Sequence, residues 1–420
     1  MATPNNNRGR KRAPRAFVLA IVALWVVAVA LAGYAIWHSL TGAGAATVPA
    51  PGPVASAPLD DVTTTLPPTT TEATTTTTLA PVLTVAAGGD VLGDRKVGTF
   101  MDANGGAAVF AGVKPYMEGA DLAFVNLEGP ISDQGHRNTR KQFTFRARPA
   151  LLDGLVSAGI NMVSLANNHS LDYGWGALSD CIARLDAAGV SHAGAGADAP
   201  GAAAPAMLQT PAGTVAFIAV SEITASFAAG SHPGTYYTSG SNDGLVANVS
   251  AAAQQADFVI VSLHWGKEYH PEVTSHQVSL GHRLIDAGAD LVLGHHPHVI
   301  EGMEIYKDRL IVYSMGDFVF DHFSRATGEA FVLQVTMPQD GPPWGTITPV
   351  YLTDSHGIPA VVTGSEANRI LSRLTSLSAA LGLQLNREGD TATFGSPTPA
   401  PDTVTSTTSV PVSPTTTLTP

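Results

Sequence analysis

The sequence GHHPHV, residues Gly294 to Val299, places three imidazoles within four residues, directly after the apolar run from Leu291 to Leu293. The run predicts a short buried strand. At the end of a strand, the spacing between His296 and His298 can turn both rings toward one site, because Pro297 fixes the backbone between them. Neutral imidazole is the commonest metal ligand in proteins. The alternative is a polar loop that is merely rich in histidine, so the metal interpretation depends on further ligands converging there.

Five other apolar runs also end in polar side chains. Ligands of open α/β sheets bind outside the carboxyl ends of the strands, so clusters at six such ends are expected to meet. The polar residues at these six ends are Asp90, then Asn126 and Glu128, then Asn167, Asn168, His169 and Asp172, then His264, then His295, His296 and His298, and finally Asp317. Each has a structural alternative when taken alone. Asp172, for example, could cap the helix that begins near Tyr173.

Strand and helix patterns alternate over residues 82–394, which predicts one folded α/β body. The consecutive strands near its end favour mixed rather than purely parallel pairing. Thr274 and Gln277 form the pattern of a capping box. The predicted strands are 82–87, 122–126, 161–166, 215–220, 257–263, 291–293, 310–314, 330–335 and 346–352, and the predicted helices are 149–158, 175–188, 274–287 and 366–381.

The ligand types indicate the class of metal. Carboxylates, an amide and imidazoles suit Mn, Fe or Zn better than Ca, and no thiolate site can form because Cys181, predicted to lie in the core, is the only cysteine. Six candidate ligands are too many for one tetrahedral ion. They fit a pair of metal ions, as in hydrolases that use such a pair to polarise a phosphoryl oxygen. The six are Asp90, Glu128, Asn168, His264, His296 and His298.

Other polar residues beside these candidates suggest roles in catalysis and substrate binding. His169, next to Asn168, would protonate a leaving group, with Asp172 as its partner. Arg140, Lys141 and Arg146 could hold an anionic substrate, although ordinary surface charge explains each of them as well. We assign substrate binding to Asn126, Arg140, Lys141, His295 and Asp317.

The charge distribution excludes one class of partner. Residues 1–15 carry five basic residues and no acid, so the remaining 17 Lys and Arg face 34 Asp and Glu, a net charge of −17. Such a body is not expected to bind nucleic acid.

The N-terminal residues predict attachment to a membrane. The 21 residues from Phe17 to Trp37 carry no charge and follow the basic cluster, which predicts a transmembrane anchor at 16–38 with the tail 1–15 in the cytoplasm. A cleaved signal peptide is the alternative. Residues 39–81 and 395–420, rich in Pro and Thr, predict a stalk and a disordered tail. The main domain is therefore expected outside the cell membrane.

The motifs GGDV, NLEGP, ANNHSLDYG, SLHWG, GHHPHV and SMGDFVFD, in this order between Leu83 and Asp321, resemble those of the CapA family of capsule or poly-γ-glutamate synthesis proteins. This family resembles the calcineurin-like metallophosphoesterases. The resemblance implies a four-layer sandwich of two mixed β-sheets flanked by helices. It also implies one or two divalent metal ions.

The resemblance assigns roles by position. Asp90 corresponds to the first metal aspartate and Glu128 to a bridging carboxylate, while Asn168 and His169 match a ligand and general acid. His264 matches the lone histidine, and His296 and His298 match the closing pair, which leaves His295 as a neighbour. Leu92 stands where the superfamily usually has a histidine, so single-metal binding stays open. Asp317 stands where the family more often has Asn and could add a ligand or a hydrogen bond to one.

These expectations lead to two main hypotheses. The first is a membrane-anchored, extracytoplasmic hydrolase with a phosphoesterase-like site that acts in the synthesis or export of an anionic cell-envelope polymer such as poly-γ-glutamate. The second is a non-catalytic scaffold that binds metal and polymer beside other membrane proteins of capsule synthesis. A weaker third is a peptidase or transferase acting on an amide-linked polymer.

Overall fold

The computed structural model describes residues 81–396. Outside these residues lie the predicted cytoplasmic tail (1–15) and membrane anchor (16–38), together with nearly all of the predicted stalk (39–81) and C-terminal tail (395–420). Within residues 81–396, none of the helices combines the length and the apolar character that a membrane crossing requires.

The larger sheet mixes parallel and antiparallel strands and has the order β17-β18-β15-β14-β1-β2-β3-β4, with β13 paired to β1 and β16 to β15. Pairs β1–β2, β2–β3, β3–β4 and β1–β13 are parallel, whereas β1–β14 and β14–β15 are antiparallel. Its strands are β1 (Val82–Val91), β2 (Leu122–Leu127), β3 (Met162–Ser164), β4 (Ser191–Ala193), β13 (Asp317–Val319), β14 (Glu329–Pro338), β15 (Trp344–Leu352), β16 (Pro359–Val361), β17 (Asn386–Glu388) and β18 (Thr391–Phe394).

The second sheet has the order β11-β12-β10-β9-β7-β6, with β7, β9, β10 and β12 parallel to one another. Its strands are β6 (Ala206–Thr210), β7 (Gly213–Ser221), β9 (Phe258–His264), β10 (Leu291–His295), β11 (Met303–Tyr306) and β12 (Arg309–Val312). A small third sheet pairs β5 (Ala195–Gly196) with β8 (Gly234–Thr235).

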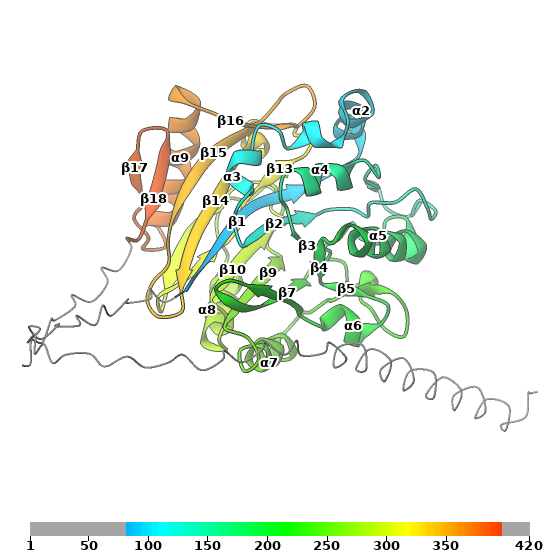
Figure 1. The fold of residues 1–420 in the computed structure, drawn as a ribbon, viewed down its shortest axis with the longest axis horizontal. Helices are drawn as coiled ribbons and strands as arrows, with labels where there is room; N and C mark the ends of the chain where they lie inside the picture. The colour runs from blue at the N-terminus through cyan, green and yellow to red at the C-terminus, as the bar shows by residue number, and fades with distance from the viewer. Residues whose placement is uncertain (1–80, 397–420) are drawn as a thin grey trace, which may run out of the picture. The chain divides into compact units, whose positions relative to one another are not determined.

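Three apolar clusters arrange the sheets and helices in layers (Figure 1). One cluster joins the two sheets, for example Phe124 of β2 with Phe217 of β7, whose ring centroids are 4.8 Å apart. A second packs α2, α3, α4 and α5 on the larger sheet, and a third packs α7 and α8 on the second sheet. The helices are α2 (Arg95–Asn104), α3 (Lys114–Met117), α4 (Leu151–Ser157), α5 (Gly174–Ala188), α6 (Ala199–Ala203), α7 (Asp243–Ala252), α8 (Ser275–Asp286) and α9 (Gly364–Ala379).

The structure confirms the prediction of a mixed α/β fold with more than one sheet. The capping box is present: Thr274 Oγ1 accepts from the Gln277 N–H at 3.2 Å, and Gln277 Oε1 accepts from the Thr274 N–H at 2.9 Å. Cys181 lies in the core, as expected. Asp172, in contrast, does not cap α5, because Tyr173 occupies the N-cap position.

Candidate metal centre

The carboxyl ends of β1, β2, β9 and β10 and the start of β13 meet at one place, which brings the predicted polar clusters together. In the larger sheet, Asp90 of β1 is in register with Asn126 of β2 and Asp317 of β13. In the second sheet, His264 ends β9 in register with His295, which ends β10. Because each side chain sits at the end of a hydrogen-bonded strand, the geometry of the cluster is fixed by the backbone of the two sheets.

Asp90 lies at the centre of the cluster and is fully buried. Its carboxylate accepts hydrogen bonds from Asn126 Nδ2 at 2.8 Å and from the His296 N–H at 3.2 Å. The Asp90 N–H donates to the carbonyl of Gly316 at 3.0 Å. A Cβ at position 89 would lie 1.9 Å from that carbonyl oxygen, so only glycine at position 89 permits this approach.

The loop after β10 presents His296 and His298 through an unusual backbone. Their φ angles are +97° and +57°, positive values that non-glycine residues uncommonly adopt, although Asn, Asp and His do so more often than the rest. The carbonyl of Pro297 between them accepts from the Tyr269 N–H at 2.8 Å, which fastens the loop. His298 Nδ1 lies 2.7 Å from Asp317 Oδ1. Left-handed backbone of this kind concentrates at functional sites.

Glu128 provides the clearest sign that this cluster could hold a cation. Both of its carboxylate oxygens are buried, and neither has a hydrogen-bond partner within the described residues. Oε1 faces His169 Nε2 at 3.7 Å and His298 Nε2 at 3.8 Å. His296 Nδ1 is likewise buried and unpartnered in this part of the chain. Buried polar groups are normally hydrogen-bonded, so these orphaned ligand atoms fit a divalent cation.

Three groups of ligand atoms each lie within 4.8 Å of one another in the described chain. They are Asp90, Glu128 and His264; Asp90, His298 and Asp317; and Glu268, His296 and His298. Asn168 adjoins the first group, with Oδ1 2.8 Å from His264 Nε2. Asp90, rather than Glu128, is the carboxylate shared by two groups. These donor types suit Mn, Fe or Zn better than Ca.

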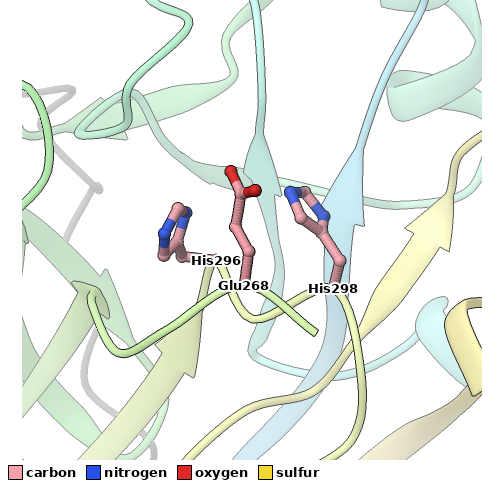
Figure 2. A group of neighbouring side chains, drawn as sticks. All are labelled: Glu268, His296 and His298. Carbon is pink, nitrogen blue, oxygen red and sulfur yellow. The ribbon is translucent and has the colours of Figure 1, made fainter. Parts of the chain in front are cut away.

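Glu268 was not among the predicted ligands. Figure 2 shows its carboxylate between the imidazoles of His296 and His298. It comes from the loop between β9 and α8 and is exposed, whereas both histidines are buried. Its position four residues after His264, in HWGKEY, was the available signal. No strand ends there, so the reasoning from strand ends passed over it.

His169 belongs to a second chain of contacts at the edge of the cluster. Its Nδ1 lies 2.5 Å from Asp172 Oδ2, and Lys141 Nζ donates to the other oxygen of Asp172 at 2.6 Å. The Phe145 N–H also donates to Asp172, at 2.8 Å. Asp172 therefore orients the His169 ring, and Nε2 is left facing Glu128. Burial lowers the pKa of His169 to about 4, against the opposing effect of Asp172.

The remaining predicted substrate residues occupy different surroundings. Asn126 is buried and bonds Asp90, so it orients a candidate ligand. His295 is fully buried, with Nδ1 3.2 Å from Asp90 Oδ1 and its ring against Phe124. Asp317 is buried within one of the three ligand groups. Arg140 is exposed on the loop between β2 and α4, where its N–H donates to Asn138 Oδ1.

Electrostatics within the cluster reflect many charges buried together. Burial, and then the charge of Asp90, raises the pKa of Glu128 well above its usual value. Burial raises the pKa of Asp317 to about 7. Burial lowers the pKa of His264 strongly and that of His296 to about 3, in each case with a further contribution from a neighbouring histidine. Glu128 and Asp317 therefore resist ionisation, whereas the pKa of Asp90 is lowered despite its burial, by the hydrogen bond and charge of His295. The imidazoles of His264 and His296 stay neutral, which is the form that binds metal.

Fold and site together define a mixed α/β protein with a buried centre of carboxylates and imidazoles between two sheets. The family model described as "Bacterial capsule synthesis protein PGA_cap" matches residues 84–322, more than half of the chain. The chain therefore belongs to this family, and the resemblance to CapA proteins is confirmed.

Curated relatives carry corresponding names. The "Capsule biosynthesis protein CapA" of Bacillus anthracis is 29% identical over 303 residues, covering 70% of this chain and 73% of that protein. The "PGA biosynthesis protein CapA" of Bacillus subtilis is 28% identical over 298 residues, covering 70% and 78%. A "Probable polyglutamine synthesis accessory protein" of Mycobacterium tuberculosis is 34% identical over 240 residues, covering 53% and 63%.

Proposed function

We propose that this protein is a metal-dependent, phosphoesterase-like hydrolase that acts in the synthesis or export of an anionic cell-envelope polymer such as poly-γ-glutamate. Family membership supports the polymer, because the relatives are named for capsule and PGA biosynthesis. The two facing sheets with helices outside support the likeness to metallophosphoesterases that the motifs implied.

The observation that carries the proposal is the pair of orphaned oxygens on Glu128, buried beside Asp90, His264 and His298. Several kcal/mol would be needed to bury such a carboxylate alone, and a bound cation removes this penalty. A divalent ion held there would polarise an oxygen of an anionic substrate. Asp90, Glu128, Asn168, His264, His296 and His298 would hold it, with Asp317 and Glu268 as additional donors.

The protein's own groups supply the proton chemistry. His169 opens onto the cavity beside the centre, and Asp172 fixes the ring so that Nδ1 is engaged and Nε2 is available. With its Nδ1–H donated to Asp172, the ring would take up at Nε2 the proton that the attacking water loses and would pass it to the leaving-group oxygen. Lys141 bonds Asp172 and the carbonyl of Asn168, at 2.6 and 2.5 Å, so it positions both residues rather than reaching for substrate.

We also propose that the protein is anchored in the cell membrane by its N-terminal residues. Residues 16–38 would anchor the chain with residues 1–15 in the cytoplasm, and the described domain would lie outside the cell. The stretch 39–81 would separate the domain from the lipid. Other membrane proteins of capsule synthesis would be its neighbours there. Alkaline phosphatase and green fluorescent protein fused after residue 396 test this: phosphatase activity without fluorescence is expected, and the reverse pattern would contradict the orientation.

The test of the centre is metal analysis of the purified full chain followed by turnover of bis-p-nitrophenyl phosphate. We expect one or two equivalents of Mn, Fe or Zn, chelator-sensitive turnover, and a large loss of rate in His169→Ala. Metal uptake and poly-γ-glutamate binding without turnover would instead establish the scaffold. A chain that takes up no divalent metal would refute both functions.

A further inference from the structure

A cavity of about 380 Å³ opens beside the metal centre. Its inner wall contains His169, His298 and Asp317, which belong to the centre itself. Its outer wall contains side chains that the proposed chemistry does not use: Arg95, Lys96, Phe143, Tyr269 and Phe323. A substrate that reaches the centre through this cavity would place the rest of its molecule against this outer wall.

Exposed aromatic side chains gather on that wall. Phe143, Tyr269 and Phe323 have exposed fractions of 52%, 47% and 72%, and they are three of the seven large hydrophobic residues exposed within the described chain. Their concentration at one cavity marks a binding surface rather than scattered exposure. Tyr269 and Phe323 meet edge to face with ring centroids 5.0 Å apart, and Tyr269 stacks on His298 at 5.9 Å. The aromatic surface thus continues into the centre.

Arg95 supplies a cation beside these rings. Its guanidinium carbon lies 5.3 Å from the Phe143 centroid and 4.9 Å from that of Phe145, and Phe145 in turn stacks on His169 at 4.0 Å. These distances place the guanidinium no more than about 9 Å from the His169 ring. The φ of Arg95 is +52°, and Asp94 Oδ1 accepts from its N–H at 2.8 Å. The backbone of Arg95 is therefore in a seldom-populated conformation, and its side chain lines the cavity.

The acidic side chains near Arg95 occupy few of its N–H donors, so the guanidinium can still bind an anion. Its guanidinium makes one hydrogen bond within the described residues, from Nη1 to Asp321 at a long 3.5 Å. Glu268 also lines the cavity, but it lies with His296 and His298 in a candidate ligand group. Lys96 adds a second exposed positive charge. A guanidinium has five N–H donors in a fork that matches carboxylate and phosphate groups.

We propose that Arg95, together with the aromatic surface of Phe143, Tyr269 and Phe323, is a subsite for the part of the substrate next to the reacting group. The subsite takes a second oxyanion, a carboxylate or a phosphate, carried on an apolar or planar segment that lies against the rings. It rests on the proposed function, since the reacting group must first be placed at the metal centre. The enzyme would thereby prefer a substrate with repeated negative charge over an isolated phosphoester.

Three non-hydrolysable probes test this by titration calorimetry on the metal-loaded full chain. Methylphosphonate occupies the centre alone, phenylphosphonate adds a ring, and 4-carboxyphenylphosphonate adds a ring and a second anion. In the wild type we expect the carboxylated probe to bind about tenfold more tightly than phenylphosphonate, as one charge-assisted hydrogen-bonded pair provides. In Arg95→Gln this ratio is expected to fall to about one, with methylphosphonate affinity unchanged.

Two further variants separate the subsite from general effects. Phe323→Ala, at a largely exposed ring, is expected to weaken both aromatic probes severalfold relative to methylphosphonate. Arg387→Gln removes an exposed arginine on edge strand β17 and should leave every ratio unchanged. A tenfold ratio that persists in Arg95→Gln would overturn the subsite while the proposed function stands. If methylphosphonate shows no metal-dependent binding to the wild type, the proposed function fails, and the subsite with it.

Discussion

The substitution Glu128→Gln is expected to raise the stability of the metal-free protein and to reduce the stabilisation that bound metal provides. Glu128 is 1% exposed, and its oxygens have no hydrogen-bond partner among the described residues. The charge of Asp90 adds to the effect of burial in raising its pKa. The amide has the shape of the acid but no charge. We therefore expect the variant to stabilise the metal-free protein and to weaken metal binding.

The size of the effect follows from burial. An unsatisfied buried polar group costs about 1–3 kcal/mol, and more when it is charged. For a domain of about 300 residues, 1 kcal/mol corresponds to about 1.5 °C in Tm, so the metal-free variant should melt about 2–4 °C above the wild type. At a thousand times its Kd, a metal ion adds about 4.1 kcal/mol, or about 6 °C, to the wild type. The order of the two melting temperatures should therefore reverse when metal is added.

Scanning calorimetry of both proteins, with chelator and then with Mn²⁺ or Zn²⁺, measures this reversal. Glu118→Gln is the matched control, because Glu118 is exposed and pairs only with Lys114 at 3.6 Å within the described residues. The control should melt with the wild type in both conditions. Equal metal-induced shifts in Glu128→Gln and wild type would refute the assignment of Glu128 as a ligand.

Three further predictions concern residues outside the centre. Burial raises the pKa of Cys181 to about 12, so iodoacetamide at pH 8 should label it only after unfolding; labelling of the native protein, seen by mass spectrometry, would contradict its burial. Burial raises the pKa of Glu301 from 4.5 to about 8, so the folded state keeps a proton that the unfolded state loses. Stability should fall as pH rises from about 4.5 to about 8, and Glu301→Gln should remove that loss, up to about 4 kcal/mol in urea denaturation at pH 9 and little at pH 4.5. Thr274→Ala removes the capping box of α8 and should lower the free energy of unfolding by about 1 kcal/mol, whereas an unchanged denaturation midpoint would show that the cap contributes nothing.

The main strands and the convergence of their polar ends were predictable because both depend on local patterns. Apolar runs such as 258–263 are buried on both faces, and each turns polar where the strand leaves the core. The pairing partners were not predictable in this way. Asp317 begins the three-residue strand β13, whose place beside β1 depends on contacts more than two hundred residues away in sequence.

The residues that sequence reasoning missed lie where the chain has no periodicity. Glu268 is in a loop, and Arg95 is the first residue of a helix that follows β1 closely. Their relation to the centre comes from loop geometry and from stacking on Phe145, which carry no sequence signature. Arg140 is the opposite case. It lies close to the site motifs in the sequence, yet in the fold it is exposed and does not line the cavity.

The backbone of the histidine loop is unusual at both of its candidate ligands. Left-handed φ at His296 and at His298 is unfavourable by about 1–3 kcal/mol each, so surrounding contacts must stabilise the loop. A Cβ on Gly294 would lie 1.9 Å from the Tyr313 carbonyl oxygen, so the glycine allows β10 to lie directly against the chain after β12. The Gly294 carbonyl accepts from the Met315 N–H at 3.1 Å, which closes the contact. Contacts with the second sheet therefore support the backbone of the loop that carries both imidazoles.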